Sequence, residues 1–280
     1  MHTQLHQLLA DQAGARGDRP ALSYKDATIS YGELWDEVVA FAGGLQRIGL
    51  GGGERVAVYV DKRIETVVSI FGTSAAGGVF VPVNPVLKPR QVAYILADCA
   101  VRVLVTTAER LELLRDELAG TEVEHVVVIG DATATAGAVQ VHAWETFGES
   151  GALAASRAID LDMAAILYTS GSTGRPKGVV LSHRNLLVGG ASVSQYLENR
   201  AEDVILAALP LSFDAGFSQL TTAFTVGAHV VLVNYLVARD VVRLCARHGK
   251  QNGTRAMAAV LVLGREFGRA SCRERVSSVV

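Results

Sequence analysis

Residues 168–178, with the sequence YTSGSTGRPKG, hold the side chains best suited to chemistry. Glycines let the backbone approach a ligand closely, so that consecutive N–H groups can converge on phosphate oxygens. Hydroxyl groups add hydrogen-bond donors, and a lysine adds a mobile positive charge. The glycines are Gly171, Gly174 and Gly178, the hydroxyl groups belong to Ser170, Ser172 and Thr173, and the lysine is Lys177. This composition predicts a loop that binds phosphate.

Two familiar nucleotide-binding loops do not fit this segment. A Walker loop needs a second glycine five residues after the first, and then Lys followed by Ser or Thr. Counting from Gly171, the residue at position 176 is Pro176, and Lys177 is followed by Gly178. A dinucleotide-binding G-x-G-x-x-G after a strand is also missing from the segment. A flexible Gly/Ser linker is the structural alternative, but apolar runs flank the segment and an Arg-Pro-Lys unit lies inside it.

Apolar runs at 163–167 and 179–181 predict two buried strands joined by the exposed loop. Upstream, segments of strand length alternate with segments of helical periodicity. Predicted strands cover residues 55–60, 79–83, 101–106 and 125–129, and predicted helices cover 64–76, 89–97 and 108–118. This alternation is typical of a parallel, doubly wound α/β sheet. Residues 132–156, rich in Ala, Gly, Thr and Ser, are interpreted as a surface connection or subdomain boundary.

The two flanks of this region carry their own signals. A helix (3–15) and a hairpin (21–30) precede a capping box of Ser30 and Glu33, which starts a helix that ends at Gly49. After the loop, Ser182 is predicted to cap a helix that runs to about residue 197. The remaining predicted elements are strand 204–208, helix 215–226, strand 230–233 and helix 238–248.

Composition narrows the class of protein. Half of the 280 residues are hydrophobic, 28 are glycine and the net charge is −2, which favours an α/β fold and gives no global attraction to nucleic acid or anionic membrane. Apolar stretches at 66–87 and 215–238 are interrupted by polar and turn-forming residues, so neither is predicted to span a membrane. Three widely spaced cysteines and an N-terminus without signal-peptide character predict free thiols in the cytoplasm.

Other candidate catalytic groups have simpler explanations. Residues 72–76 (GTSAA) nearly match a nucleophile elbow around Ser74, but the final glycine is missing and the segment is predicted to lie within a helix. The seven histidines show no metal-ligand spacing. His183 is interpreted as a helix-start residue, because no partner for a catalytic base can be located from the sequence.

Residues 168–178, followed by VVLSHRN at 179–185, closely resemble the phosphate-loop signature of the adenylate-forming superfamily, which includes acyl-CoA synthetases, luciferases and amino-acid adenylation domains. The resemblance covers about residues 1–249. It implies an incomplete N-terminal domain of stacked, mostly parallel sheets flanked by helices. It also implies two half-reactions: a carboxylate attacks the α-phosphate of ATP to give an acyl-adenylate and pyrophosphate, and the thiol of coenzyme A or of a carrier pantetheine then displaces AMP.

The resemblance also implies roles for single residues. Residues 169–174 would wrap the β- and γ-phosphates, and Lys177 would stabilise their charge. Thr169 and Lys177 are thus the expected catalytic residues, and the expected nucleotide-binding residues are Thr169, Ser170, Gly171, Ser172, Thr173, Gly174 and Lys177. We expect Mg²⁺ to be held partly by ATP, without a dedicated set of protein ligands, because magnesium usually relies on substrate phosphates.

A second segment, residues 209–217 (LPLSFDAGF), resembles the substrate-pocket motif of the same superfamily. The resemblance implies that Phe213 forms part of the pocket for the carboxylate substrate. In amino-acid-activating members an Asp at the place of Asp214 fixes the substrate ammonium, so an amino-acid substrate remains an alternative. The structural alternative is that Asp214 is only the N-cap of the following helix.

The chain departs from the superfamily in its second half. Members are much longer, and their later parts supply a magnesium-binding Glu, a ribose-binding Asp, a hinge and a C-terminal domain with a mobile lysine, none of which has a matching position here. Residues 250–280 are interpreted as a non-native tail, with a basic nucleic-acid-binding tail as the alternative. The favoured function is an AMP-forming acyl-CoA ligase, of which this chain is an inactive part. An amino-acid or carrier-protein adenylating enzyme, acting with an acyl-carrier protein, and a non-catalytic nucleotide-binding fragment are the alternatives.

Overall fold

The computed structural model describes residues 2–130, 139–148, 153–169, 175–234 and 256–258. The strands are β1 (Pro20–Tyr24), β2 (Ala27–Ser30), β3 (Arg55–Tyr59), β4 (Val79–Pro82), β5 (Val101–Thr107), β6 (His125–Ile129), β7 (Gln140–Ala143), β8 (Met163–Thr169), β9 (Lys177–Ser182), β10 (Val204–Ala207), β11 (His229–Leu232) and β12 (Ala256–Ala258). The helices are α1 (Gln7–Arg16), α2 (Tyr31–Arg47), α3 (Ile64–Ala75), α4 (Pro89–Asp98), α5 (Ala108–Leu114), α6 (Trp144–Phe147), α7 (His183–Tyr196) and α8 (Asp214–Val226), with the short 3-10 helix η1 (Leu118–Gly120).

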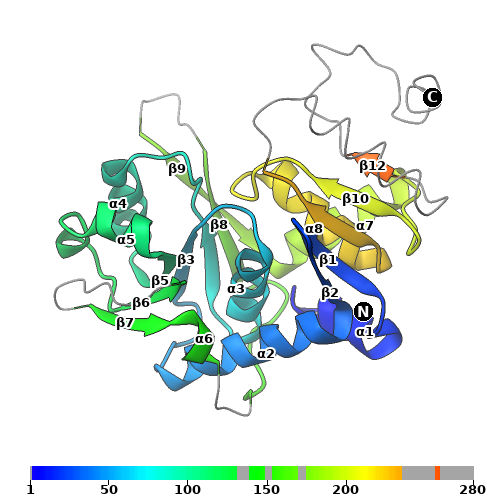
Figure 1. The fold of residues 1–280 in the computed structure, drawn as a ribbon, viewed down its shortest axis with the longest axis horizontal. Coiled ribbons are helices and arrows are strands. Elements are labelled where there is room, and N and C mark those ends of the chain that lie inside the picture. Colours follow the sequence, from blue (N-terminus) through cyan, green and yellow to red (C-terminus); the bar gives the residue numbers. More distant parts are fainter. Residues whose placement is uncertain (1, 131–138, 149–152, 170–174, 235–255, 259–280) are drawn as a thin grey trace.

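These strands form two sheets (Figure 1). The seven-stranded sheet has the order β7-β6-β5-β3-β4-β8-β9, and the five-stranded sheet has the order β12-β10-β11-β1-β2. The hairpin pairs β1–β2 and β8–β9 are antiparallel, and the other paired strands run parallel. The predicted α/β fold with mostly parallel sheets is therefore confirmed.

The central strands of the seven-stranded sheet are buried on both faces. Along β3, Val56 and Val58 belong to one core cluster, whereas Ala57 and Tyr59 belong to another. Because neighbouring residues of a strand point to opposite faces, these two clusters lie on opposite sides of the sheet. Side chains of α2 and α3 share the first cluster, and side chains of α4 and α5 share the second. Residues buried on both faces explain why these strands read as continuous apolar runs.

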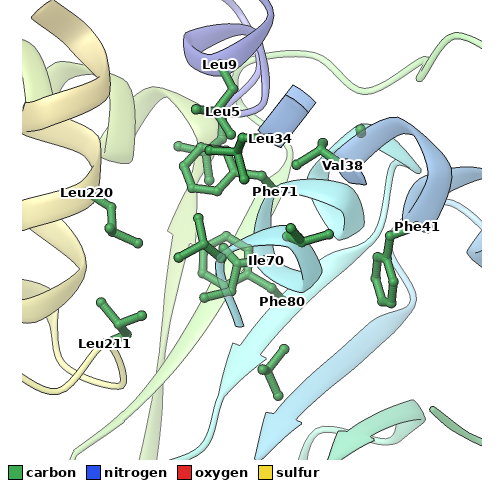
Figure 2. Close-up of a cluster of buried hydrophobic side chains, with 14 of the residues drawn as sticks. Leu5, Leu9, Leu34, Val38, Phe41, Ile70, Phe71, Phe80, Leu211 and Leu220 are labelled. Carbon is green, nitrogen blue, oxygen red and sulfur yellow. The ribbon is translucent and has the colours of Figure 1, made fainter. Parts of the chain in front are cut away.

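The first cluster also joins the two sheets. Figure 2 shows side chains from α1, α2, α3, β4 and α8 gathered around Phe71 and Ile70. The ring of Phe71 lies 5.4 Å from that of Phe224, and the ring of Phe80 lies 5.0 Å from that of Phe217. In Figure 1, α2 extends beneath both sheets, and it contacts α3 as well as β1 and β2. This shared core fixes the two sheets relative to each other.

Some predicted elements differ from the structure. The run 179–181 was expected to form a buried strand, but β9 lies at the edge of its sheet, and Val179 and Val180 are 44% and 58% exposed. Residues 132–156 were interpreted as a connection, yet β7 within them pairs with β6 and extends the same sheet. The following α6 buries Phe147 against Phe41, with ring centroids 5.3 Å apart.

Boundaries agree to within a few residues elsewhere. The predicted helix 108–118 ends at Leu114 and is followed by η1. The predicted helix 238–248 and most of the segment 250–280 lie outside the described residues, but β12 within that segment pairs in parallel with β10. Within the described ranges, none of the helices has the length and apolarity needed to cross a bilayer.

Two histidines, the half-buried His6 and the buried His183, lie where the N-terminal segment packs onto the rest of the fold. His6 Nδ1 lies 3.2 Å from the hydroxyl of Ser74, which sits inside α3, as the sequence predicted. His183 is the first residue of α7, and its Nδ1 accepts a hydrogen bond from the Leu5 N–H at 3.1 Å. Burial, aided by the neighbouring His183, lowers the pKa of His6 to about 4, and burial also lowers the pKa of His183.

Acidification is expected to destabilise this region through His6. Between pH 6.5 and about 4 the unfolded chain binds a proton at His6 that the folded chain excludes, so stability falls as the pH falls. The loss is at most about 3 kcal/mol by pH 4. Urea unfolding of the wild type and of His6→Gln, whose amide can still bond Ser74, should show a shallower loss of stability in the variant. Parallel pH profiles would contradict this assignment.

Candidate functional site

The phosphate-loop candidate is the connection between the two strands of the β8–β9 hairpin. In this antiparallel pair Thr169, the last residue of β8, lies directly opposite Lys177, the first residue of β9. Both residues are exposed. Ser170, Gly171, Ser172, Thr173 and Gly174 lie outside the described residues. The hairpin thus brings a hydroxyl and an ammonium group to the same end, which is a suitable pair for an anion.

Helix α4 holds the end of this hairpin that carries the loop. The Tyr168 hydroxyl donates a hydrogen bond to Asp98 Oδ2 at 2.6 Å, and the Tyr94 hydroxyl donates one to the Pro176 carbonyl at 3.4 Å. Burial and the hydrogen bond to Asp98 raise the pKa of Tyr168 above its ordinary value. Because Tyr168 and Pro176 flank the loop on either side, α4 holds both of its ends.

Gly178 has a different role from the one expected. The sequence suggested that it lets the backbone approach a ligand. In the structure Gly178 pairs with Tyr168 inside the hairpin, and a Cβ added there would lie 2.7 Å from Ile166 Cγ2. Gly178 therefore makes room for the packing of β8, a contact that only the strand register reveals.

The second candidate segment forms the turn between β10 and α8. Leu211 is buried and points into the core cluster drawn in Figure 2, whereas Phe213 is 42% exposed and Asp214 is also exposed. The N-cap residue of α8 is Phe213, which makes no side-chain capping bond, and Asp214 is the first helical residue. The proposed N-cap role of Asp214 is therefore wrong, although a carboxylate in the first turn still favours the helix dipole.

The phosphate-loop hairpin and the turn after β10 both lie near the carboxyl ends of parallel strands. The β8 strand runs parallel to β4, and β4 runs parallel to β3. Thr169, at the carboxyl end of β8, therefore lies on the same side of the sheet as the carboxyl end of β3. Lys62, which follows β3, reaches the carbonyls at the end of β10, just before the turn to Phe213. Ligands of open α/β sheets bind at the carboxyl ends of the strands, so this edge is the expected place for a site.

Sequence reasoning missed Lys62 and Asp98. Neither belongs to a motif, and each acts on a segment far away in the chain: Lys62 on residues near 208, and Asp98 on Tyr168. A lysine three residues after a buried strand was the available signal for Lys62. In the part of the chain that the structure describes, no three His, Cys, Asp or Glu side chains gather as metal ligands.

Comparisons with known proteins give the family. The family model described as "AMP-binding enzyme" matches residues 9–266, which continues past residue 249, where the motif resemblance ended. The chain is 35% identical to L-proline--[L-prolyl-carrier protein] ligase of Streptomyces coelicolor over 85% of this chain and 45% of that protein. It is 31% identical to crotonobetaine/carnitine--CoA ligase of Salmonella paratyphi A over 84% of this chain and 47% of that protein.

Solved structures agree with this result. The anthranilate CoA ligase AuaEII, crystallised in complex with anthranoyl-AMP, superimposes with a TM-score of 0.79 at 27% identity, over 87% of this chain and 48% of that protein. The chain spans about half the length of the curated relatives it matches. Since the family model matches most of the chain, and the fold and the hairpin agree with it, the chain belongs to the AMP-binding enzymes of the adenylate-forming superfamily.

Proposed function

We propose that this chain is the phosphate-loop part of an AMP-forming acyl-CoA ligase. Such an enzyme joins a carboxylic acid to the α-phosphate of ATP, releases pyrophosphate, and then transfers the acyl group to the thiol of coenzyme A. The observation that carries the proposal is the pairing of Thr169 with Lys177 at the end of the hairpin where the loop connects its two strands. Similarity to two CoA ligases supports it.

The residues of the chain would contribute binding and charge neutralisation. Residues 169–174 would surround the β- and γ-phosphates, and Lys177 would balance the charge that develops on the departing pyrophosphate. The Thr169 hydroxyl and the Lys177 ammonium fit a triphosphate as donor and cation, whereas Mg²⁺ would be held mainly by the phosphates. Phe213 would contact the acid. The complete reaction, in the cytoplasm, is proposed for the full-length protein, because the chain spans about half of its relatives.

Asp214 supports a second candidate, an amino-acid or carrier-protein adenylating enzyme. Its carboxylate is exposed at the start of α8 and makes no N-cap bond, so it is available to a substrate ammonium. The similarity to a ligase that loads L-proline onto a carrier protein favours the same reading. The acceptor would then be the pantetheine of a carrier protein. A third possibility, a nucleotide-binding chain without turnover, predicts ATP binding without pyrophosphate exchange.

Substrate-dependent ATP–pyrophosphate exchange by the full-length protein tests these functions. Each amino acid is paired with the acid that lacks its amino group. We expect Asp214→Ala to lower exchange with amino acids by about 10- to 100-fold, because an ammonium loses its charged partner, and to leave simple acids almost unchanged. Asp26→Ala, in the exposed turn between β1 and β2, is the control. An equal loss with both substrates would contradict ammonium recognition, and no exchange with any acid would contradict the ligase.

A further inference from the structure

Lys62 connects the two sheets near the carboxyl ends of the strands, where the candidate segments lie. It follows β3 and is 8% exposed. Its ammonium donates hydrogen bonds to the carbonyl oxygens of Ala207 at 2.8 Å, Ala208 at 2.6 Å and Leu209 at 3.1 Å. These carbonyls end β10 and begin the turn that leads to Phe213. Lys62 is therefore a direct contact between the seven-stranded sheet and the substrate-pocket turn.

The ammonium matches these carbonyls in number and in charge. A lysine ammonium has three N–H donors and no acceptor, and each donor here has one carbonyl partner. The Ala207 carbonyl also accepts a hydrogen bond from the Val233 N–H at 3.3 Å, whereas Lys62 supplies donors to the carbonyls of Ala208 and Leu209, which lie beyond β10. Burial lowers the pKa of Lys62 to about 8, which leaves the side chain mostly protonated at neutral pH. The contacts are thus charge-assisted hydrogen bonds, the stronger class.

Other hydrogen bonds hold Lys62 itself and the turn in place. Asn234, just after β11, donates a hydrogen bond from its side-chain amide to the Lys62 carbonyl at 2.8 Å. The Leu209 N–H donates to Gln219 Oε1 of α8 at 3.4 Å. The beginning of the turn is therefore connected to α8 through Leu209 and to the segment after β3 through Lys62, and of these two links only Lys62 reaches from the sheet that carries Thr169 and Lys177.

We propose that Lys62 is a positioning residue for the acid substrate. It holds residues 207–209 against the end of β3, and so sets the position of Phe213 and Asp214 relative to the phosphate loop. In the seven-stranded sheet one strand, β4, separates β3 from β8, so these two strands lie about 10 Å apart. An acid held at the turn must meet ATP held at the loop, and a small displacement of one against the other is costly for a reaction that depends on orientation. The inference rests on the proposed function.

The test separates acid binding from ATP binding in the full-length protein. Lys62→Met keeps an unbranched side chain of nearly the same length and removes its three donors. We expect the KM for the acid to rise about 10- to 100-fold, while the KM for ATP changes less than about threefold. Lys62→Arg, which keeps the charge and several donors, should recover part of the loss. Lys25→Met, at an exposed lysine in the β1–β2 turn, is the matched control.

Amide hydrogen exchange gives a readout that does not depend on activity. In Lys62→Met, amides of residues 207–217 should exchange faster, whereas those of β8 keep the rate of the wild type. If Lys62→Met does not fold, Lys62→Gln, whose amide keeps two donors, replaces it. Equal rises of both KM values, or unchanged exchange at 207–217, would overturn the proposal. If the wild type activates no acid, the proposed function fails, and amide exchange alone still decides whether Lys62 holds the turn.

Discussion

Replacing Lys177 with alanine is expected to lower acid-dependent pyrophosphate exchange by the full-length protein about 10²- to 10³-fold. Lys177 is the first residue of β9 and lies directly opposite Thr169, at the end of the hairpin where the phosphates would lie. A fixed cation beside the departing pyrophosphate stabilises charge that grows in the transition state, and loss of one such group typically has this effect. The loss should appear mainly in kcat, because the interaction strengthens as the bond breaks.

The fold should tolerate this substitution. Lys177 is exposed, so the thermal midpoint of Lys177→Ala should stay close to that of the wild type. Lys177→Arg keeps the charge but changes its shape and reach, and an intermediate rate is expected from it. Exchange at the wild-type rate in Lys177→Ala would remove Lys177 from the reaction. A large drop in the thermal midpoint would instead show that the residue supports the hairpin.

Local signals in the sequence predicted much of the fold. The Ser30 hydroxyl accepts a hydrogen bond from the Glu33 N–H, and Glu33 accepts one from the Ser30 N–H, as the capping box required. Ser182 caps α7 in the same way with Asn185. The alternation of strands and helices gave the parallel sheet because each signal comes from residues within a few positions of one another. The phosphate-loop hairpin was predictable for the same reason.

Sheet order depends on contacts between distant residues, and here prediction failed. The apolar run at Val179 and Val180 has the composition of a central strand, but β9 has a neighbour on one side only. An apolar run shows that a strand forms and does not show whether it lies at an edge. The strand β7 was missed because its four residues are partly buried or exposed. They contribute little to the core, so their sequence shows no clear apolar pattern.

The candidate site shows the same division. Thr169, Lys177, Phe213 and Asp214 belong to compact motifs, and the structure places the first two at strand ends and the last two at the start of α8. The residues that hold those motifs do not share a motif with them. Lys62 and residue 208 are 146 positions apart in the chain, so only the packed sheets bring them together. Sequence patterns therefore identify groups that contact a ligand more readily than groups that position them.

Gly216→Ala is expected to destabilise the protein by about 3 kcal/mol, because the added methyl group cannot be accommodated without moving the backbone. A Cβ at Gly216 would lie 1.8 Å from the Pro210 carbonyl oxygen and 2.6 Å from its carbon. Backbone atoms cannot rotate away as a flexible side chain could. Since Pro210 and Gly216 enclose Phe213 and Asp214, relief of the clash must displace the turn that presents them.

Gly189→Ala is the matched control for this prediction. Gly189 lies in α7, and a Cβ added there meets no atom within 4 Å. Alanine is favoured over glycine in a helix, so this variant should gain about 0.5–1 kcal/mol in the free energy of unfolding. Urea unfolding of both variants measures the two effects. If Gly216→Ala matched Gly189→Ala in stability, the close approach of Pro210 would be refuted, and with it the tight turn that sets Phe213 at the start of α8.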